Sequence, residues 1–216
     1  MRWITAGAWA CAAALLSMSG CNIIGPAYVL IHGPEKTPAL FTLEKDRSTV
    51  IFIDDRANIL SPRALRQTIA QTAQKALLEN KTLTNVIDGR AAILAASEES
   101  SSELLDIATL GKRVGADIVI YATTLKFELS PDGQTFQPEA RFNVKVLDVT
   151  KPQPRLWPAE REGYPLVVTG GPRAGTLPRT TSEVNKARQA LADRAGVAIA
   201  RLFFSYETHE RAMESR

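Results

Sequence analysis

The sequence predicts one α/β domain: a single mixed β-sheet of about five strands covered by about three helices, in the order β-α-β-α-β-β-β-α. Three observations predict this class. Short β-branched runs alternate with stretches whose apolar residues recur at helical spacing. A long alternating stretch is followed by a turn and a second alternating stretch, which is typical of an antiparallel hairpin. The length, 216 residues of which 45% are hydrophobic, suits one medium-sized domain.

The first half of this domain alternates strands with helices. Residues 49–53 form a β-branched and aromatic run that ends in two aspartates, which predicts a buried strand. Ser61 and Pro62 predict an N-cap and a first helical position, and an amphipathic helix then runs to about residue 80. Three further elements are predicted on the same grounds: a strand over 84–88, a short helix over 90–97 and a helix over 100–114 that a capping box opens.

A hairpin forms the second half of the predicted sheet. Residues 116–129 begin apolar on both faces and then alternate, with Leu125, Phe127 and Leu129 opposite the charged residues. A Pro-Asp-Gly turn returns the chain into a second alternating strand over 142–146. The charged residues of the hairpin are expected on one wet face: Lys126, Glu128, Arg141 and Lys145.

The last elements are an edge strand and a long helix. Either residues 156–157 or residues 166–168 supply the edge strand, since a proline adjoins each. A capping box from Thr180 to Glu183 opens the final helix. Right-handed crossovers over the first two helices make the first three strands largely parallel.

The N-terminus has the layout of a secretory signal peptide. Residues 1–20 carry one basic residue, an apolar run too short to span a bilayer comfortably and then small residues. The segment ends in Met18-Ser19-Gly20-Cys21, which resembles the lipobox of bacterial lipoproteins, although that pattern prefers Leu where Met18 stands. The resemblance implies cleavage between Gly20 and Cys21 and acylation of Cys21, including a palmitate-type chain. A plain signal peptide or an uncleaved anchor is the alternative.

The resemblance to lipoproteins also implies a location in the cell envelope. Residue 22 is Asn rather than the Asp that retains a lipoprotein in the inner membrane, which implies outer-membrane, periplasm-facing placement. Residues 21–46 are expected to form a lipidated tether, in which Gly-Pro pairs interrupt apolar residues, and whether part of it docks stays open. The domain is expected over residues 47–206, with a polar tail over 207–216.

The element order, together with Val114-Gly115-Ala116-Asp117 leading into the central strand, resembles a known group of periplasmic domains. That group includes the curli secretion lipoprotein CsgG, the penicillin-binding-protein activator LpoB and the N-terminal domain of TolB. The resemblance covers about residues 48–204 and implies fold more than function. It also implies a non-catalytic role in secretion, activation or docking, and no catalytic residue transfers from it.

Three carboxylates are candidates for a ligand site, because Asp54, Asp55 and Asp88 follow two predicted strands at the edge where open α/β sheets bind ligands. Such carboxylates suit a metal-assisted hydrolase, or they cap helices and open turns. The only histidines, His32 and His209, lie outside the predicted core, which leaves no triad or zinc ligand set. We therefore expect no catalytic residue, metal or cofactor.

A second set of candidates concerns partners. Trp157 and Tyr164 lie in a Pro-rich edge segment and suit either an interface or a lid on the core. Arg173 and Arg179 lie in a Gly-rich loop over residues 170–179, which is either a surface loop or a partner contact that they anchor. Removing residues 1–20 leaves 25 basic and 23 acidic side chains, which does not suggest a nucleic-acid partner. The expected function is a non-enzymatic envelope lipoprotein that binds the bilayer through its acyl chains and another envelope protein or itself. The alternatives are the hydrolase and a small-ligand sensor.

Overall fold

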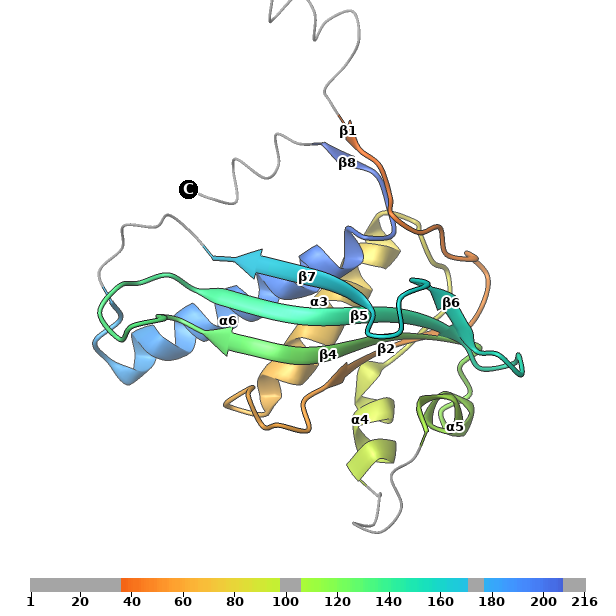
Figure 1. Cartoon of the computed structure of the whole chain (residues 1–216), viewed down its shortest axis with the longest axis horizontal. Helices are drawn as coiled ribbons and strands as arrows, with labels where there is room; N and C mark the ends of the chain where they lie inside the picture. Colours follow the sequence, from red (N-terminus) through yellow and green to blue (C-terminus); the bar gives the residue numbers. More distant parts are fainter. Residues whose placement is uncertain (1–35, 98–105, 171–176, 208–216) are drawn as a thin grey trace, which may run out of the picture.

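A computed structural model describes residues 36–97, 106–170 and 177–207 (Figure 1). Its elements follow in chain order: β1 (Lys36–Thr37), β2 (Thr49–Asp54), α3 (Ala64–Glu79), β3 (Val86–Ile87), α4 (Gly89–Ser97), α5 (Ile107–Arg113), β4 (Ile118–Glu128), β5 (Glu139–Asp148), β6 (Arg155–Trp157), β7 (Tyr164–Thr169), α6 (Thr181–Ala200) and β8 (Tyr206–Glu207).

The main sheet is mixed, as the sequence predicts. Its order is β3-β2-β4-β5, and β6 and β7 both pair with β5 along its far side. Strand β2 runs parallel to β3 and β4, and the remaining pairs are antiparallel. The predicted fold class and the parallel arrangement of the first three strands are therefore confirmed. Both candidate edge strands form, so the sheet has six strands among the described residues.

Helices α3 and α6 cover one face of the sheet (Figure 1). The two helices approach closely because both present small residues to the contact. A Cβ added at Gly196 of α6 would lie 2.6 Å from the carbonyl oxygen of Ile69 and 2.6 Å from Cβ of Thr72, both in α3. This face holds the larger core, which includes Phe142 from the middle of β5.

Helices α4 and α5 cover only part of the opposite face. Their core takes in Phe52, Val119 and Tyr121, near the start of the sheet. Beyond it, the face carries a cross-strand ladder of charges, in which Lys126 Nζ lies 2.7 Å from Glu128 Oε1 and 3.3 Å from an oxygen of Glu139. The charged residues of the hairpin thus gather on this face, as the sequence predicts.

Some local predictions are wrong in detail. Ser61 does not cap α3, because the helix begins at Ala64 with Arg63 at the N-cap and no side-chain cap bond. Leu125 is 50% exposed instead of facing inward, because the pairing with β5 shifts between Thr124 and Lys126 and turns this residue out. The strand predicted over residues 84–88 forms as β3 but is only two residues long.

Two predicted caps give different outcomes. The capping box of the last helix is confirmed, since the Thr180 side chain accepts from the Glu183 amide and the Glu183 side chain accepts from the Thr180 amide. The capping box predicted over residues 100–103 lies outside the described residues. The described part of that helix starts at Ile107, after Asp106.

The chain before β2 packs against the domain. Strand β1 pairs with β8, so the two ends of the described chain lie side by side (Figure 1). The amide of Leu40 donates to the carbonyl oxygen of Leu202 at 2.8 Å, and Leu43 is buried in the larger core. Residues 36–43, which the sequence analysis includes in the predicted tether, therefore pack against the domain.

Candidate functional site

Asp54 is buried at the end of β2 and is held within the chain. Its carboxylate accepts a hydrogen bond from the Tyr121 hydroxyl and lies 3.2 Å from Nε of Arg56. Burial, and next the hydrogen bond to Asp54, raise the pKa of Tyr121 to about 12. The carboxylate thus fixes a tyrosine and an arginine.

The other two carboxylates hold backbone. Asp55 accepts from the amides of Ile59 and Leu60 at 2.8 and 3.0 Å, which closes the turn after β2. Asp88 accepts from the amide of Arg90 at 2.9 Å, at the start of α4. Their bonding is that of turn and cap residues.

The three carboxylates also do not converge. The pairing of Val50 with Ile87 sets Asp88 level with Ile51, three residues short of Asp54, which is about 10 Å along a strand. Nowhere in residues 36–97, 106–170 and 177–207 do three His, Cys, Asp or Glu side chains gather as metal ligands would. The geometry therefore favours the turn-and-cap interpretation of these residues.

Trp157 joins segments that are distant in the sequence. Its ring stacks on Phe41 at a centroid distance of 6.0 Å, tilts against Tyr164 at 5.2 Å and meets Phe203 edge-on at 6.2 Å. These partners come from the segment before β2, from β7 and from the residues after α6. The half-buried ring is thus a lid on the larger core, and it fastens both ends of the domain to the sheet edge.

The remaining candidates are spread out. Arg179 is exposed, and its amide donates to Oε2 of Glu183 at 2.8 Å as part of the helix cap. Gly20, Cys21 and Arg173 lie outside the described residues. Of the partner candidates, the structure thus brings together Trp157 and Tyr164.

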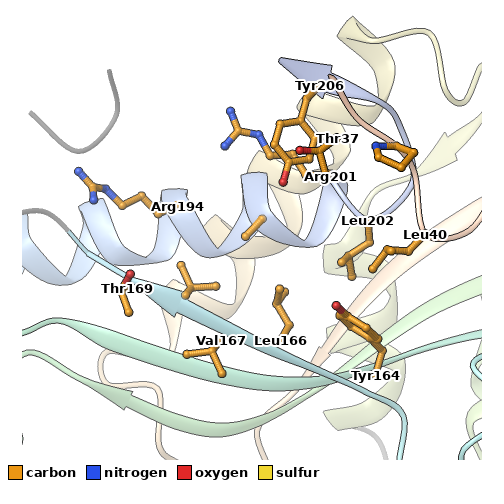
Figure 2. A pocket seen from close by; sticks show the side chains of 13 residues that line it. Thr37, Leu40, Tyr164, Leu166, Val167, Thr169, Arg194, Arg201, Leu202 and Tyr206 are labelled. Carbon is orange, nitrogen blue, oxygen red and sulfur yellow. The ribbon is translucent and has the colours of Figure 1, made fainter. Parts of the chain in front are cut away.

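A groove runs beside β7, and the sequence alone does not reveal it. Figure 2 shows it between β7 and α6, with the β1 and β8 segments across one side. Its volume is about 530 Å³. The residues that line it are Thr37, Pro38, Leu40, Tyr164, Leu166, Val167, Val168, Thr169, Arg194, Ala198, Arg201, Leu202 and Tyr206.

The outer edge of β7 opens onto this groove. The amide of Gly170 donates to the carbonyl oxygen of Pro138 at 2.8 Å, which sets the alternation of the β5–β7 ladder. Leu166 and Val168 therefore direct their backbone groups to β5, whereas Val167 and Thr169 direct theirs outward. Pro165 also faces outward, where its missing N–H costs no ladder bond.

The ionisable groups that line the groove are basic or phenolic. Arg194 lies on α6 and Arg201 is its C-cap residue, and the Arg201 guanidinium lies over the Tyr206 ring at 4.7 Å. No Asp or Glu is among the lining residues. The groove is separated from Asp54 by two strands, since β4 and β5 lie between β2 and β7.

Local sequence signals point to only one wall of the groove. The β-branched run beside Pro165 predicts an edge strand, and the structure confirms that strand. The opposite wall depends on the packing of α6 and on the β1–β8 pair, which joins residues about 170 positions apart. Periodicity within a window of the chain cannot reveal such contacts.

No protein-family model matches this sequence, and no curated protein matches it. Similar solved structures do exist. The hypothetical protein CT253 from Chlamydia trachomatis is 16% identical, with a TM-score of 0.42, over 74% of this chain and 92% of its own. A PelC dodecamer from Paraburkholderia phytofirmans is 13% identical, with a TM-score of 0.35, over 78% and 96%. Lipoprotein GNA1162 from Neisseria meningitidis is 12% identical, with a TM-score of 0.36, over 69% and 95%.

These comparisons establish a structural similarity at low identity. The finer resemblance, to the group that includes CsgG, LpoB and TolB, stays a prediction. Neither the function of this chain nor its assembly is assigned from the three structures.

Proposed function

We propose that the chain is a cell-envelope lipoprotein whose α/β domain binds another envelope protein without catalysing a reaction. The single observation that carries the anchor is the sequence Met18-Ser19-Gly20-Cys21 after a short apolar run. Two or more acyl chains on Cys21 hold a protein on a bilayer stably. None of the helices within the described residues has the length and hydrophobicity to cross a membrane.

The proposal includes the location and the fold group. Asn22 supports the periplasmic side of the outer membrane. The alternation of elements supports membership in the group that includes CsgG, LpoB and TolB. Confinement to a membrane raises the effective concentration of a partner in the same envelope, so modest affinity suffices.

The binding surface that the geometry supports best is the β6–β7 edge. Strand edges accept a further strand through main-chain hydrogen bonds, and the outward groups of Val167 and Thr169 are of this kind. The adjoining groove adds apolar contact and two arginines. The carboxylates of Asp54, Asp55 and Asp88 each accept a hydrogen bond from another group of the chain, which supports a role without catalysis.

The anchor is tested with Cys21→Ala in the native host. We expect the variant to leave the membrane fraction and to lose the mass of the acyl chains. Cys11→Ala is the matched control, because Cys11 is discarded with the leader, and it should fractionate as the wild type does. A Cys21→Ala protein that stays membrane-bound at unchanged mass would contradict the anchor.

Binding through the edge is tested by mild crosslinking in native membranes. Tyr164→Ala and Val167→Ala should lower the yield of a crosslinked partner protein, while the melting temperature of Val167→Ala, an exposed change on β7, stays nearly unchanged. Lys112→Ala, an exposed change on α5, is the control and should crosslink normally. Equal yields for all variants would place the interface elsewhere.

A further inference from the structure

Strand β7 pairs with β5 alone among the described strands, so its other edge carries backbone groups directed away from the sheet. Val167 and Thr169 each direct an N–H and a C=O to that side, and Pro165 directs a carbonyl. Exposed groups of this kind accept a further strand. A strand that adds here has the groove beside α6 on one of its faces, so the groove determines which side chains that strand can carry.

Helix α6 runs antiparallel to β7 along this edge (Figure 2). At one end, a Cβ added at Gly170 would lie 3.5 Å from Cδ1 of Leu191. At the other end, the Trp157 ring contacts the rings of Tyr164 and Phe203, at centroid distances of 5.2 and 6.2 Å. From Leu191 to Phe203 the helix and its last turn rise about 18 Å, and from Tyr164 to Gly170 the strand extends about 20 Å. The two elements therefore stay level with each other along the whole groove.

Two arginines lie on the helix wall of the groove. Arg194 and Arg201 are seven residues apart, which is about two helical turns, so both are on the same face of the helix. Their spacing is about 10 Å along the helix axis. Ala198 lies between them and lines the groove as well. An added strand thus meets a cation, an apolar residue and a second cation in that order.

The charge of the groove favours an anionic occupant. None of the described residues that line it is acidic. Asp193, which precedes Arg194, accepts a hydrogen bond from Oγ1 of Thr72 in α3 at 3.1 Å and is directed to that helix. The Tyr206 ring, 4.7 Å from Cζ of Arg201, holds the second cation in place. A guanidinium has five N–H donors, so each arginine can hold a carboxylate in addition to its contacts within the chain.

We propose that the β6–β7 edge binds a partner strand with two acidic side chains four residues apart on its α6 side and an apolar residue midway between them. This inference rests on the proposed function, since it names the chemistry of the strand that the edge binds. Side chains on one face of a strand repeat about every 6.8 Å, so positions i and i+4 are about 13 Å apart. The long side chains of Arg194 and Arg201 close the difference of about 3 Å from their own spacing. The residue at i+2 then faces Ala198, whichever way the partner strand runs.

Charge also selects this occupant over a second copy of the chain. Pairing of two β7 strands about a twofold axis places Arg194 and Arg201 of both copies at one junction, where like charges repel. An acidic strand instead gives each guanidinium a carboxylate, and such charge-assisted hydrogen bonds can be bidentate. The partner is thus a different protein, with Asp or Glu in the segment that binds.

Two synthetic peptides test the charge requirement on the mature chain with Cys21→Ser, which carries no lipid. One is acetyl-Thr-Asp-Thr-Val-Thr-Asp-Thr-amide, and the other has Asn in place of both Asp residues. We expect the Asp peptide to bind about tenfold more tightly or better, because charge-assisted hydrogen bonds are stronger than neutral ones. Its binding should shift the NMR signals of the Val167 and Thr169 amides. Its advantage over the Asn peptide should shrink as NaCl is raised.

Variants of α6 assign the effect to the groove. Arg194→Gln should weaken binding of the Asp peptide about fivefold or more and leave binding of the Asn peptide unchanged, which also controls for the fold. Lys186→Gln is the matched control, because Lys186 is exposed on the same helix and does not line the groove. It should bind both peptides as the wild type does. Equal affinities for the two peptides, no binding of either, or signal shifts away from β7 would overturn the proposal.

Crosslinking in native membranes separates this inference from the proposed function. Arg194→Glu should lower the yield of the crosslinked partner about tenfold or more, whereas Lys186→Glu should not. If Val167→Pro abolishes the crosslink and Arg194→Glu leaves it at the wild-type level, binding at the edge stands and the acidic strand is contradicted. If Val167→Pro keeps the crosslink as well, the binding edge itself is wrong, and this inference fails with it.

Discussion

Arg47 and Asp148 form a bidentate ion pair between the start of β2 and the end of β5. Nη1 lies 2.7 Å from Oδ2 and Nη2 lies 2.9 Å from Oδ1, across 101 residues of sequence. The Asp148 side chain is fully buried, and Lys151 Nζ lies 3.1 Å from it. Two parallel hydrogen bonds add directionality to the attraction, so the pair fixes the segment before β2 against the hairpin.

Removing the arginine should destabilise the fold. Arg47→Met leaves the buried carboxylate of Asp148 with Lys151 and Thr150 alone, and we expect the free energy of unfolding to fall by about 2–3 kcal/mol. Arg141→Met is the control, because Arg141 pairs with Glu139 at the surface and should cost about 0.5 kcal/mol. Chemical denaturation measures both, and equal costs would contradict the structural role of the pair.

The same pair should make stability depend on acid. The hydrogen bond from Arg47 chiefly holds the pKa of Asp148 well below its ordinary value near 3.8. Because the folded-state pKa is depressed, the contribution is complete above about pH 4 and is lost as the pH falls toward the folded value. The stability difference between wild type and Asp148→Asn should therefore narrow below about pH 4. A difference that is constant or grows in acid would contradict this.

Contact between α3 and α6 should make Gly196 intolerant of a methyl group. Helix propensity alone predicts that Gly196→Ala stabilises α6 by about 1 kcal/mol. The added Cβ would meet backbone and Cβ atoms of α3 at 2.6 Å, so we expect a net loss of about 2 kcal/mol instead. Ala190→Gly, exposed on the same helix, measures propensity alone. A stabilised Gly196→Ala protein would show that the helices are not in close contact.

The buried Tyr121 hydroxyl should ionise at a higher pH than an exposed tyrosine does. Burial and its hydrogen bond to Asp54 raise its pKa from 10.0 to about 12. A raised pKa means that this contribution to stability is present below about pH 10 and is lost as the pH rises through the folded value. In a pH titration, the difference in phenolate absorbance between the wild type and Tyr121→Phe should therefore show a step at about pH 12. A step near the ordinary value of 10.0 would show that the hydroxyl is neither buried nor held by Asp54.

The emission of Trp157 should report the packing of the segment before β2. After removal of residues 1–20, Trp157 is the only tryptophan. Phe41→Ala removes the ring that stacks on it, so we expect red-shifted emission and a loss of about 1–2 kcal/mol. Leu125→Ala, an exposed change on the open face, should leave the emission unchanged. An unshifted Phe41→Ala spectrum would contradict the stack.

Elements with strong local periodicity are predictable from the sequence. The hairpin of β4 and β5, the buried strand β2 and the capping box at Thr180 and Glu183 all follow from short-range patterns, and each is confirmed. Leu125 is predicted on the wrong side, because it lies at the shift in pairing between Thr124 and Lys126, whereas Phe127 and Leu129 beyond the shift pack on the larger core as predicted. No pattern in β4 alone reveals that shift.

The candidate site is less predictable. The sequence indicates the strand-end position of Asp54, but not that Tyr121 from β4 reaches it. It indicates an edge strand near Tyr164, but not the α6 wall that turns this edge into a groove. Both depend on contacts between residues more than 20 positions apart, which hydrophobic periodicity does not encode.

The most direct test of the proposed function is to purify the lipidated protein from its own membranes in detergent after mild crosslinking. We expect a second envelope protein to co-purify in stoichiometric amount. It should be lost in Val167→Pro, which removes an outward N–H as Pro165 does, and kept in Val167→Thr, which retains it. A clean monomer, or equal recovery with both variants, would contradict binding at this edge.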